Sequence, residues 1–193
     1  MNCSPSDVFV HPTALVESDQ IGAGSCIWAF SHVCHGAVIG KDCKLGDHTY
    51  VEAGAVLGNK VTLKNQVAVW DGVRLEDGVF VGPNVTFTNV TTPRARRKKD
   101  PSEYLKTVVR EGATLGAGSV LLCGIEIGRH AFVGAGAVVT KSIQDHQLVM
   151  GNPGKPDGWV CECGERLPEE LRCTCGLSYK VDTSGLVRNI RIK

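Results

Sequence analysis

The chain has 193 residues, a formal net charge of +1 and 42% hydrophobic residues. That length fits one large domain, or one domain with a small appendage. A net charge so close to zero argues against a protein that binds nucleic acid with its whole surface. No apolar run approaches the ~20 residues that cross a bilayer, and the start shows no charged and apolar signal segment. We therefore expect a cytoplasmic protein with no membrane span and no nucleic-acid partner.

An aliphatic residue or Phe recurs at every sixth position, with one interruption. Because six is a multiple of two but not of 3.6, a strand keeps these residues on one face, whereas a helix spreads them around its surface. The glycines of residues 1–150 fall at the second or fourth position of each hexapeptide, where turns often need a positive φ. The repeat predicts short parallel strands, three to a coil, with coils about 4.8 Å apart. The first-position residues are Phe9, Leu15, Ile21, Ile27, Val33, Ile39, Leu45, Val51, Leu57, Leu63, Val69, Leu75, Val81, Phe87, Val109, Leu115, Leu121, Ile127, Val133 and Val139.

Residues 93–108 interrupt the repeat between two runs of coils, which span residues 9–92 and 109–144. The interruption is strongly basic and contains Arg94, Arg96, Arg97, Lys98 and Lys99. A loop inserted into an otherwise regular solenoid usually lies on a binding face. The alternative interpretation is a solvated charged loop.

The character of the sequence changes at Trp159, after a Gly- and Pro-rich exit segment. Nine cysteines without a visible export signal favour metal binding or burial over disulfides. Four of them lie in two Cys-x-Cys-Gly turns and fit one structural, tetrahedral zinc site; a disordered tail with free thiols or a redox-labile pair is the alternative. We expect a coiled domain over residues 1–158 and a Cys-rich, zinc-ribbon-like extension over residues 159–193. The proposed metal ligands are Cys161, Cys163, Cys173 and Cys175.

Several motifs narrow this repeat to one group of enzymes. They resemble the N-acetyltransferases that acetylate the 3-amino group of a UDP-linked 2-acetamido-3-amino-2,3-dideoxyglucuronate. The resemblance runs from about residue 9 to residue 159; the exit segment departs from it, with Gly154 where the superfamily more often has Ala, and the Cys-rich tail is absent from short members. The motifs are Phe30-Ser-His32-Val-Cys34, Val69-Trp-Asp71-Gly-Val, Gly82-Pro-Asn84 with the residues up to Val90, Pro93-Arg94, Lys99-Asp100, Gly112-Ala-Thr-Leu-Gly116 and Ile127 to Val138.

The resemblance implies an all-β fold, a left-handed parallel β-helix of hexapeptide repeats with a protruding loop. It implies an acetyl-CoA-dependent enzyme of lipopolysaccharide O-antigen synthesis whose partners are coenzyme A and a UDP-amino sugar. A triangular coil has three flat faces, and apolar side chains such as Trp28 and Trp70 near their edges favour cover by further copies. We therefore expect a homotrimer.

Acetyl transfer to an amine needs a near-attack geometry and a donor for the developing oxyanion. Residues about 18 apart should lie one above another, which places Asn89 roughly 4.8 Å from Asp71 at a corner. With the resemblance, we expect Asn89 and Asp71 to orient the sugar amine; otherwise both residues serve the turn backbone, as Asx residues often do. His32 is a further catalytic candidate, as a general base, or a packing residue at a subunit interface.

The remaining site residues follow from the same resemblance. Arg94, with Lys99 and Asn84, is expected to bind the substrate, because a guanidinium fork suits a uronate carboxylate or a pyrophosphate. Coenzyme A should lie along the late coils, where small residues let the pantetheine arm reach the backbone; the same glycines could serve only the turns. The expected cofactor-binding residues are Gly116, Gly134, Ala135, Gly136 and Lys155.

Three rival functions stay open at this point. The first is acetyl transfer to a different nucleotide-linked amino sugar. The second is a non-enzymatic β-helix scaffold whose tail is an interaction module. The third is a metal-dependent hydratase of the γ-carbonic anhydrase type, which the histidine spacing disfavours because no histidine pair is placed to converge on one zinc ion.

Overall fold

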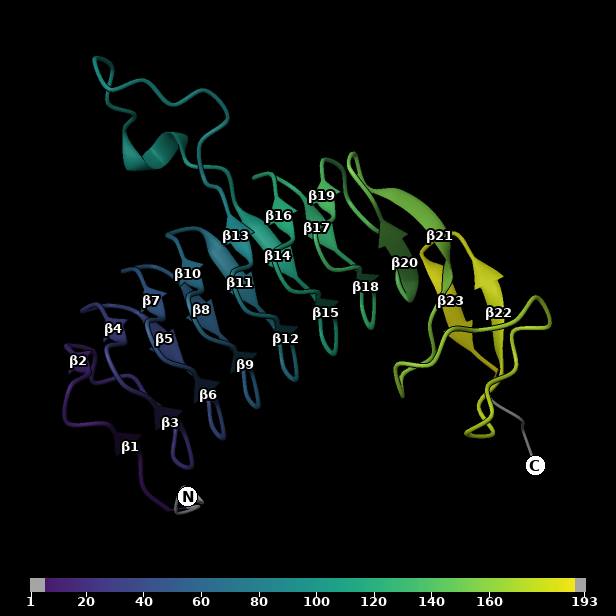
Figure 1. Cartoon of the computed structure of the whole chain (residues 1–193), viewed down its shortest axis with the longest axis horizontal. Coiled ribbons are helices and arrows are strands. Elements are labelled where there is room, and N and C mark those ends of the chain that lie inside the picture. The colour runs from purple at the N-terminus through teal and green to yellow at the C-terminus, as the bar shows by residue number, and fades with distance from the viewer. Residues whose placement is uncertain (1–5, 190–193) are drawn as a thin grey trace.

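A computed structural model describes residues 6–189 as a parallel β-solenoid followed by a small tail (Figure 1). Its strands form three sheets of nine, seven and five strands, which together make the three sides of the coil. The nine-stranded sheet contains β1 (Phe9–Val10), β3 (Cys26–Ile27), β6 (Lys44–Leu45), β9 (Thr62–Leu63), β12 (Phe80–Val81), β15 (Thr114–Leu115), β18 (Phe132–Val133), β20 (Gln147–Met150) and β21 (Lys155–Trp159). The seven-stranded sheet contains β2 (Leu15–Val16), β4 (His32–Val33), β7 (Tyr50–Val51), β10 (Ala68–Val69), β13 (Thr86–Phe87), β16 (Val120–Leu121) and β19 (Val138–Val139). The five-stranded sheet contains β5 (Val38–Ile39), β8 (Val56–Leu57), β11 (Val73–Leu75), β14 (Thr107–Val109) and β17 (Glu126–Ile127).

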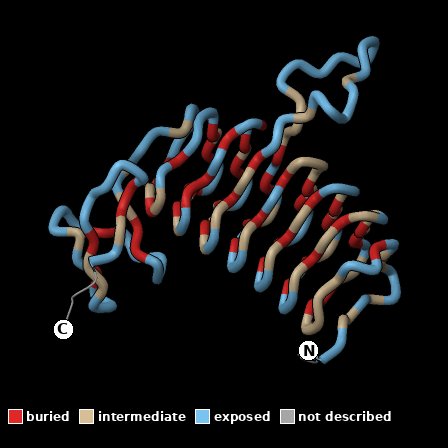
Figure 2. Tube along the Cα trace, turned by 180° about the vertical axis from the view of Figure 1, so that it is seen from behind, coloured by how far each residue is buried: buried red, intermediate tan, exposed pale blue. Residues whose placement is uncertain are grey.

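The predicted interior ladder is confirmed over most of the solenoid. From Ile27 to Val139 the first-position residues are at most 2% exposed, and they belong to one continuous core (Figure 2). Each stacks on its equivalent in the next coil: Leu45 pairs with Leu63, and Leu57 with Leu75. Every inner coil therefore buries its apolar face against two neighbours, as repeat architectures require.

The first coil departs from the predicted beat. Leu15 is 55% exposed, because β2 pairs Leu15 with His32 and Val16 with Val33. A one-residue slip moves every side chain of a strand to the other face. Val16 therefore takes the inward place expected for Leu15. The register is shifted in β1 too, where Val10 rather than Phe9 lies opposite Ile27, although Val10 is 40% exposed.

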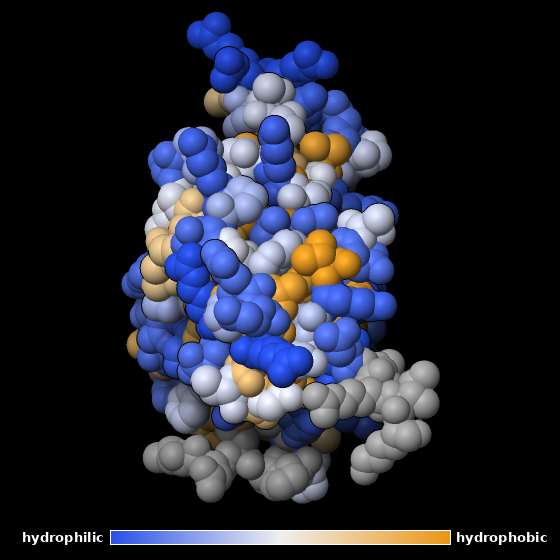
Figure 3. Space-filling model, turned by 90° about the vertical axis from the view of Figure 1, so that its right-hand side faces the viewer, coloured by the Kyte–Doolittle hydropathy of each residue, from blue (hydrophilic) through white to orange (hydrophobic). Residues whose placement is uncertain are grey.

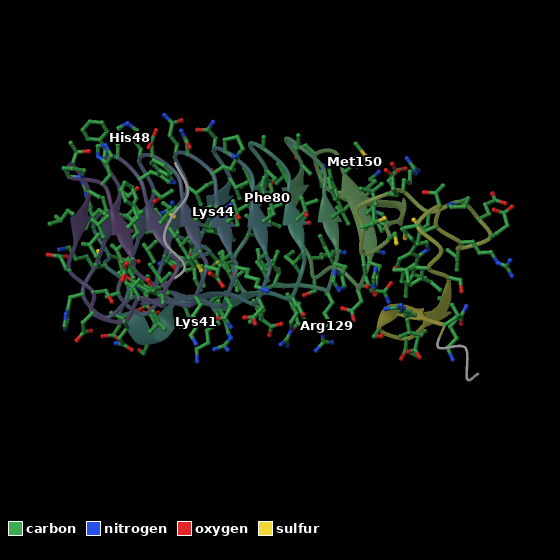
Figure 4. The ribbon with its side chains drawn as sticks, turned by 90° about the horizontal axis from the view of Figure 1, so that it is seen from below. Lys41, Lys44, His48, Phe80, Arg129 and Met150 are labelled. Atoms are coloured by element: carbon green, nitrogen blue, oxygen red, sulfur yellow. The ribbon has the colours of Figure 1, made fainter. Side chains whose placement is uncertain are left out.

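Three sets of corners join the sheets. The first corner leads from the nine- to the seven-stranded sheet and comprises residues 28–31, 46–49, 64–67, 82–85, 116–119 and 134–137. The second corner leads from the seven- to the five-stranded sheet and comprises residues 34–37, 52–55, 70–72, 88–106 and 122–125. The third corner leads back to the nine-stranded sheet. Figure 4 looks onto that sheet, with His48 of the first corner at one edge and Lys41 and Arg129 of the third corner at the other.

The expected insertion emerges at the second corner and projects away from the coils (Figure 1). It contains the 3-10 helix η1 (Pro101–Glu103), which Asp100 caps by accepting a hydrogen bond from the backbone N–H of Ser102. The chain then rejoins the solenoid in register, since Leu75 pairs with Val109 across the insertion. The solenoid thus accommodates the loop without any change in its interior.

The tail folds against the last coil. β21 pairs antiparallel with β20, and the hairpin β22 (Tyr179–Asp182) and β23 (Gly185–Arg188) reaches back to Asp145 through an isolated bridge at Gly185. Viewed from this end, the surface is mainly hydrophilic, with isolated hydrophobic patches (Figure 3). The tail therefore acts as a polar cap on the open end of the solenoid.

Two findings concern the remaining composition-based expectations. Among residues 6–189, no helix is long and apolar enough to cross a membrane. Cys26 is buried, as expected, but it is also disulfide-bonded, so the preference against disulfides is wrong at this cysteine. The other cysteines of the described chain are free thiols.

Candidate active site

Asp71 lies at the second corner, on top of the preceding coil. Its carboxylate contacts the position above Gly54, where even a Cβ would collide with it. The backbone N–H of Asp71 donates to the Glu52 carboxylate over 2.8 Å, which fixes the turn. Within residues 6–189 the Asp71 carboxylate itself accepts no recorded hydrogen bond and is half-buried. An acceptor is therefore held in place with its lone pairs free.

Asn89 begins the insertion at the same corner, one coil after Asp71. Its carbonyl accepts the backbone N–H of Leu105 over 3.0 Å, so the two ends of the loop are tied together. Lys106 then passes over Gly72, with its Cα 3.7 Å and its Cγ 3.8 Å from the position of a Gly72 Cβ. The corner next to Asp71 is thus bounded by Asn89 on one side and by the returning loop on the other.

The charged residues of the loop have different surroundings. The Lys99 ammonium lies 2.8 Å from the Glu103 carboxylate, so its charge is compensated within the loop. The Arg94 guanidinium is exposed, and within residues 6–189 it donates only to the carbonyl of Pro93, over 3.3 Å. Of the two, Arg94 is the one whose charge is available to a ligand.

His32 lies on the outer face of the seven-stranded sheet, two coils before Asp71. Its Nε2 is 3.0 Å from a Glu17 carboxylate oxygen and 3.7 Å from the Cys34 sulfur. The hydrogen bond between His32 and Glu17 is the largest cause of a lowered pKa at Glu17. The ring of Tyr50 meets the His32 ring edge-on, with centroids 5.4 Å apart, and Tyr50 in turn packs against Trp70. His32 therefore belongs to a polar cluster of its own rather than to the Asp71 corner.

The glycines expected to bind coenzyme A fall into two groups. A Cβ on Gly116 would lie 2.5 Å from the backbone N of Ala135, and one on Gly134 would lie 3.0 Å from Met150 Cγ. These two glycines allow neighbouring coils to stack closely. This agrees with the alternative interpretation, in which they serve only the turns. Ala135 and Gly136 are exposed, and a Cβ on Gly136 would meet nothing within 4 Å. Gly118 is equally open and occupies the same place one coil earlier.

Asn84 belongs to the first corner, not to the corner of Asp71 and Asn89. It has a positive φ of 59°, like Phe30, His48 and Gln66 in the coils before it. In this column the late coils have Gly118 and Gly136. This column therefore has side chains in the early coils and glycines in the late coils. Gly118 and Gly136 leave an open strip of backbone there.

The exit segment leads Lys155 to this strip. The Gly154 N–H donates to the carbonyl of Val138 over 2.7 Å, and the Val138 N–H donates to the carbonyl of Gly151 over 3.0 Å. Val138 follows Gly136 by two residues, so Lys155, which is exposed at the start of β21, is anchored beside the open strip. The structure therefore brings Ala135, Gly136 and Lys155 together, and separates them from Asp71 and Asn89 by the width of the seven-stranded sheet.

Comparison with known proteins agrees with this arrangement. The chain matches the model of the bacterial transferase hexapeptide (six repeats) over residues 20–53 and 106–141. It is 44% identical over 195 residues, with full coverage of both chains, to dTDP-3-amino-3,6-dideoxy-alpha-D-galactopyranose 3-N-acetyltransferase of Aneurinibacillus thermoaerophilus. The chain belongs to the hexapeptide-repeat N-acetyltransferases.

A solved structure extends the likeness. The acetyltransferase domain of PglB from Neisseria gonorrhoeae FA1090, in complex with acetyl coenzyme A, has a TM-score of 0.53 and 26% sequence identity. The match covers 77% of this N-acetyltransferase and 57% of that chain. The solenoid of this enzyme is therefore shared with a protein that binds acetyl coenzyme A.

Sequence reasoning missed several residues of the N-acetyltransferase that shape these corners. Gly118 carries the same signal as Gly136, since both occupy the fourth position of a late hexapeptide, and that signal was available. Glu52 and Lys106 had no such signal. Their proximity to Asp71 depends on how the turn and the loop return are folded, which no spacing rule gives.

The tail of the N-acetyltransferase brings its four cysteines together. The sulfurs of Cys161 and Cys175, and those of Cys163 and Cys173, are 3.5 Å apart, and all four lie within 4.8 Å of one another. Tetrahedral zinc with Zn–S bonds of about 2.3 Å requires sulfur separations of about 3.8 Å. The donor set therefore fits a Cys₄ site, even though each turn has only one residue between its cysteines.

The two turns have the same geometry. The Cys161 N–H donates to the carbonyl of Glu165 and the Cys173 N–H to that of Leu177, both over 2.8 Å. Gly164 and Gly176 follow with φ of 93° and 92°. A Tyr179 hydroxyl, 3.1 Å from the Cys161 sulfur, closes the inner side of the cluster.

Proposed function

We propose that this enzyme transfers the acetyl group of acetyl-CoA to the 3-amino group of a nucleotide-linked amino sugar. The observation that carries the proposal is the pairing of two unlike corners: an unengaged carboxylate at Asp71, beside a basic loop, and a strip of bare backbone at Gly118 and Gly136. The 44% identical relative is named for acetylating the 3-amino group of a dTDP-linked sugar, which supports both the reaction and the substrate class.

In this proposal the chain's own residues orient the amine. Asp71 accepts a hydrogen bond from the neutral amine, and Asn89 holds a neighbouring hydroxyl, so that nitrogen faces the thioester carbonyl. Nitrogen attack forms the C–N bond, the tetrahedral intermediate collapses with cleavage of the C–S bond, and the amine proton leaves to solvent or to the departing thiolate. The free lone pairs of Asp71 support this role; a protein base at His32 is the second mechanism.

We propose that the working enzyme is a homotrimer with sites shared between copies. In one chain the Asp71 corner and the Gly136 corner lie on opposite edges of the seven-stranded sheet, so the proposed sugar and coenzyme sites do not face each other. Hollows of about 940 Å³ and 600 Å³ occur in the tail, beside Arg172, and at the third corner, beside Asp77, and a hollow of about 140 Å³ lies beside Gly154 and Pro156. A second copy would complete the site by placing its first corner against the second corner of its neighbour.

The sugar itself divides into two options. The named relative acts on a 3-amino-3,6-dideoxy sugar linked to dTDP, whereas the motif resemblance favours a UDP-linked 3-amino uronate of O-antigen synthesis. The exposed, uncompensated Arg94 supports an anionic group on the substrate. Arg94→Ala should raise KM for a uronate more than for the neutral sugar, and equal losses would assign Arg94 to the nucleotide or to the loop.

Steady-state acetyl transfer tests the site. Asp71→Asn and Asn89→Ala should each lower kcat/KM by about 10²-fold, the size of losing one transition-state contact. Asp42→Asn is the matched control, because Asp42 also lies over a glycine, Gly24, but at the third corner. Near-normal turnover in both site variants would refute the corner assignment. Loss of turnover with intact binding in His32→Asn would favour the base mechanism.

The coenzyme strip has its own test. Gly136→Asn should raise KM for acetyl-CoA while leaving the fold intact, because asparagine tolerates a positive φ, as it does at Asn84 in the same column. His48→Asn is the control in an early coil of that column. An unchanged KM in Gly136→Asn would move the coenzyme elsewhere.

We also propose a structural zinc ion on the four tail cysteines. The sulfur separations support it, as does the pair of identical turns. Replacing Cys161 and Cys173 by serine should lower the zinc content by about one per chain in elemental analysis.

A further inference from the structure

A second cluster of metal-ligating side chains lies at the opposite end of the solenoid from the tail, two coils before Asp71. Glu17, His32 and Cys34 each offer one donor atom, and these atoms all lie within 4.8 Å of one another. We propose that these three residues form a second site for a divalent transition metal, with zinc as its best-matched ion.

The first argument is that two donors converge on one nitrogen. The Glu17 oxygen and the Cys34 sulfur both approach Nε2 of His32, at 3.0 Å and 3.7 Å. A single N–H can point at one acceptor, whereas a metal between the three atoms is shared by all of them. Tetrahedral zinc predicts an N···O separation of about 3.4 Å and an N···S separation of about 3.6 Å. The observed distances need shifts of only a few tenths of an ångström.

The second argument concerns where the ligands come from. His32 and Cys34 alternate along one edge of the seven-stranded sheet, and Glu17 follows β2, the neighbouring strand. The one-residue slip of the first coil is what places Glu17 opposite Cys34, because an unslipped coil would set Val16 there. The departure from the repeat therefore replaces an aliphatic residue with a carboxylate at this point.

The third argument is the donor chemistry. A thiolate and an imidazole select zinc or cobalt over magnesium or calcium, and three protein ligands leave a fourth position for water. The side chains of His32 and Glu17 are 36% and 48% exposed, which gives an ion a path from solvent. Tyr50, in the next coil, supports the cluster. Its hydroxyl lies 3.4 Å from the Cys34 sulfur, and its ring packs against the His32 ring.

The site would have two consequences. It would join the first coil to the second at the end of the solenoid that lacks the tail. It would also engage the Nε2 lone pair of His32, so that a metal-bound His32 cannot act as a general base through that nitrogen.

Zinc counting in full-length variants tests the proposal. Replacement of Cys161, Cys163, Cys173 and Cys175 by serine removes the tail site, and this variant, after dialysis against zinc and gel filtration, should retain about one zinc per chain. Adding Cys34→Ser or Glu17→Gln should reduce that count to zero. Adding His35→Asn, a change in an exposed histidine of the same corner and outside the donor set, should leave it unchanged.

Cobalt substitution gives a second readout that does not depend on the tail variant folding. With the tail cysteines intact, Cys34→Ser should lower the metal count by one and remove part of the thiolate-to-cobalt absorption. A four-serine variant that is folded but retains no zinc would overturn the proposal. So would a metal count and an absorption spectrum that Cys34→Ser leaves unchanged in the otherwise wild-type chain.

Discussion

The solenoid and the tail bury their interiors in opposite ways. In the solenoid, side chains at one position of a six-residue repeat form a continuous core, and each coil is hydrogen-bonded to the coils beside it. The tail has a separate cluster of five buried residues, two of which are cysteines. A core of that size cannot offset the entropy of ordering about thirty residues. The solenoid is therefore stabilised by repetition, whereas the tail needs a cross-link.

The two regions meet at a small set of polar contacts. The Val160 N–H donates to the carbonyl of His146 over 2.8 Å, and the Asp145 N–H donates to that of Ser184 over 2.9 Å. The His146 ring packs against Tyr179, with centroids 4.9 Å apart. Perturbing one region should therefore affect the other only through this junction.

Removal of metal should have the largest effect, and it should unfold the tail but not the central coils. Structural zinc contributes about 10–16 kcal/mol to the folding of small Cys-rich modules, so a chelator under reducing conditions should unfold residues 160–189. Hydrogen exchange should show loss of protection at Tyr179 and Leu186, while amides of the solenoid such as Leu63 stay protected. Tail amides that remain protected after the metal has been removed would contradict the comparison.

A cavity in the ladder should have the next largest effect and should act on the solenoid. Leu75 is fully buried between Leu57 and Val109, and Leu75→Ala should lower the free energy of unfolding by about 2–5 kcal/mol in denaturant titrations. Val181→Ala, at a residue 63% exposed in the tail, is the control and should change it by less than about 0.5 kcal/mol. Similar losses in both variants would mean that the two regions do not differ in this way.

The sequence predicts the solenoid well because one rule is repeated many times. A period of six fixes which residues face inward, and Ile27 to Val139 obey it. The same rule fails at Leu15, since a coil with a neighbour on one side only is held less strictly to its register. The four tail cysteines were also predictable, because chelation has its own spacing signature.

The candidate site could be predicted only in part. Column spacing placed Asp71 and Asn89 at one corner, whereas Asn84, which the resemblance suggested as a substrate-binding residue, lies at another. The partners of Asp71 and Lys99 depend on turn and loop conformations that have no period. Gly116 lets two coils approach closely, whereas Gly136 leaves an open surface. The sequence cannot distinguish these two roles, because both positions are simply glycine.

Replacing a glycine at the junction between solenoid and tail should have a moderate effect. Gly185 has a φ of 131°, and a Cβ there would lie 2.7 Å from the backbone N of Asp145. Gly185→Ala should therefore detach the hairpin from the last coil, at a cost of about 1–3 kcal/mol. Gly118→Ala is the control, because it has a positive φ of 64° but nothing within 4 Å of the new Cβ. Limited proteolysis should cut the tail faster in Gly185→Ala alone; equal rates would exclude a packing role.

The smallest expected effect is a pH dependence of the same junction. His146 is 5% exposed, and burial lowers its pKa below the usual value of about 6.5. Because the unfolded chain binds this proton more readily, the stabilisation is complete above pH 6.5 and declines as the pH falls from there toward the lower folded value. Nδ1 of His146 lies 3.0 Å from the carbonyl of Val160 and donates to it. The second proton must therefore bind to Nε2, the other ring nitrogen of this buried side chain.

Protection of the Val160 amide against hydrogen exchange, corrected for intrinsic exchange, should fall below pH 6.5 in the wild type. His146→Asn keeps a donor and tolerates the positive φ of 63°, and should flatten the profile, whereas His35→Asn should not. A wild-type slope that persists in His146→Asn would assign the pH dependence to another group.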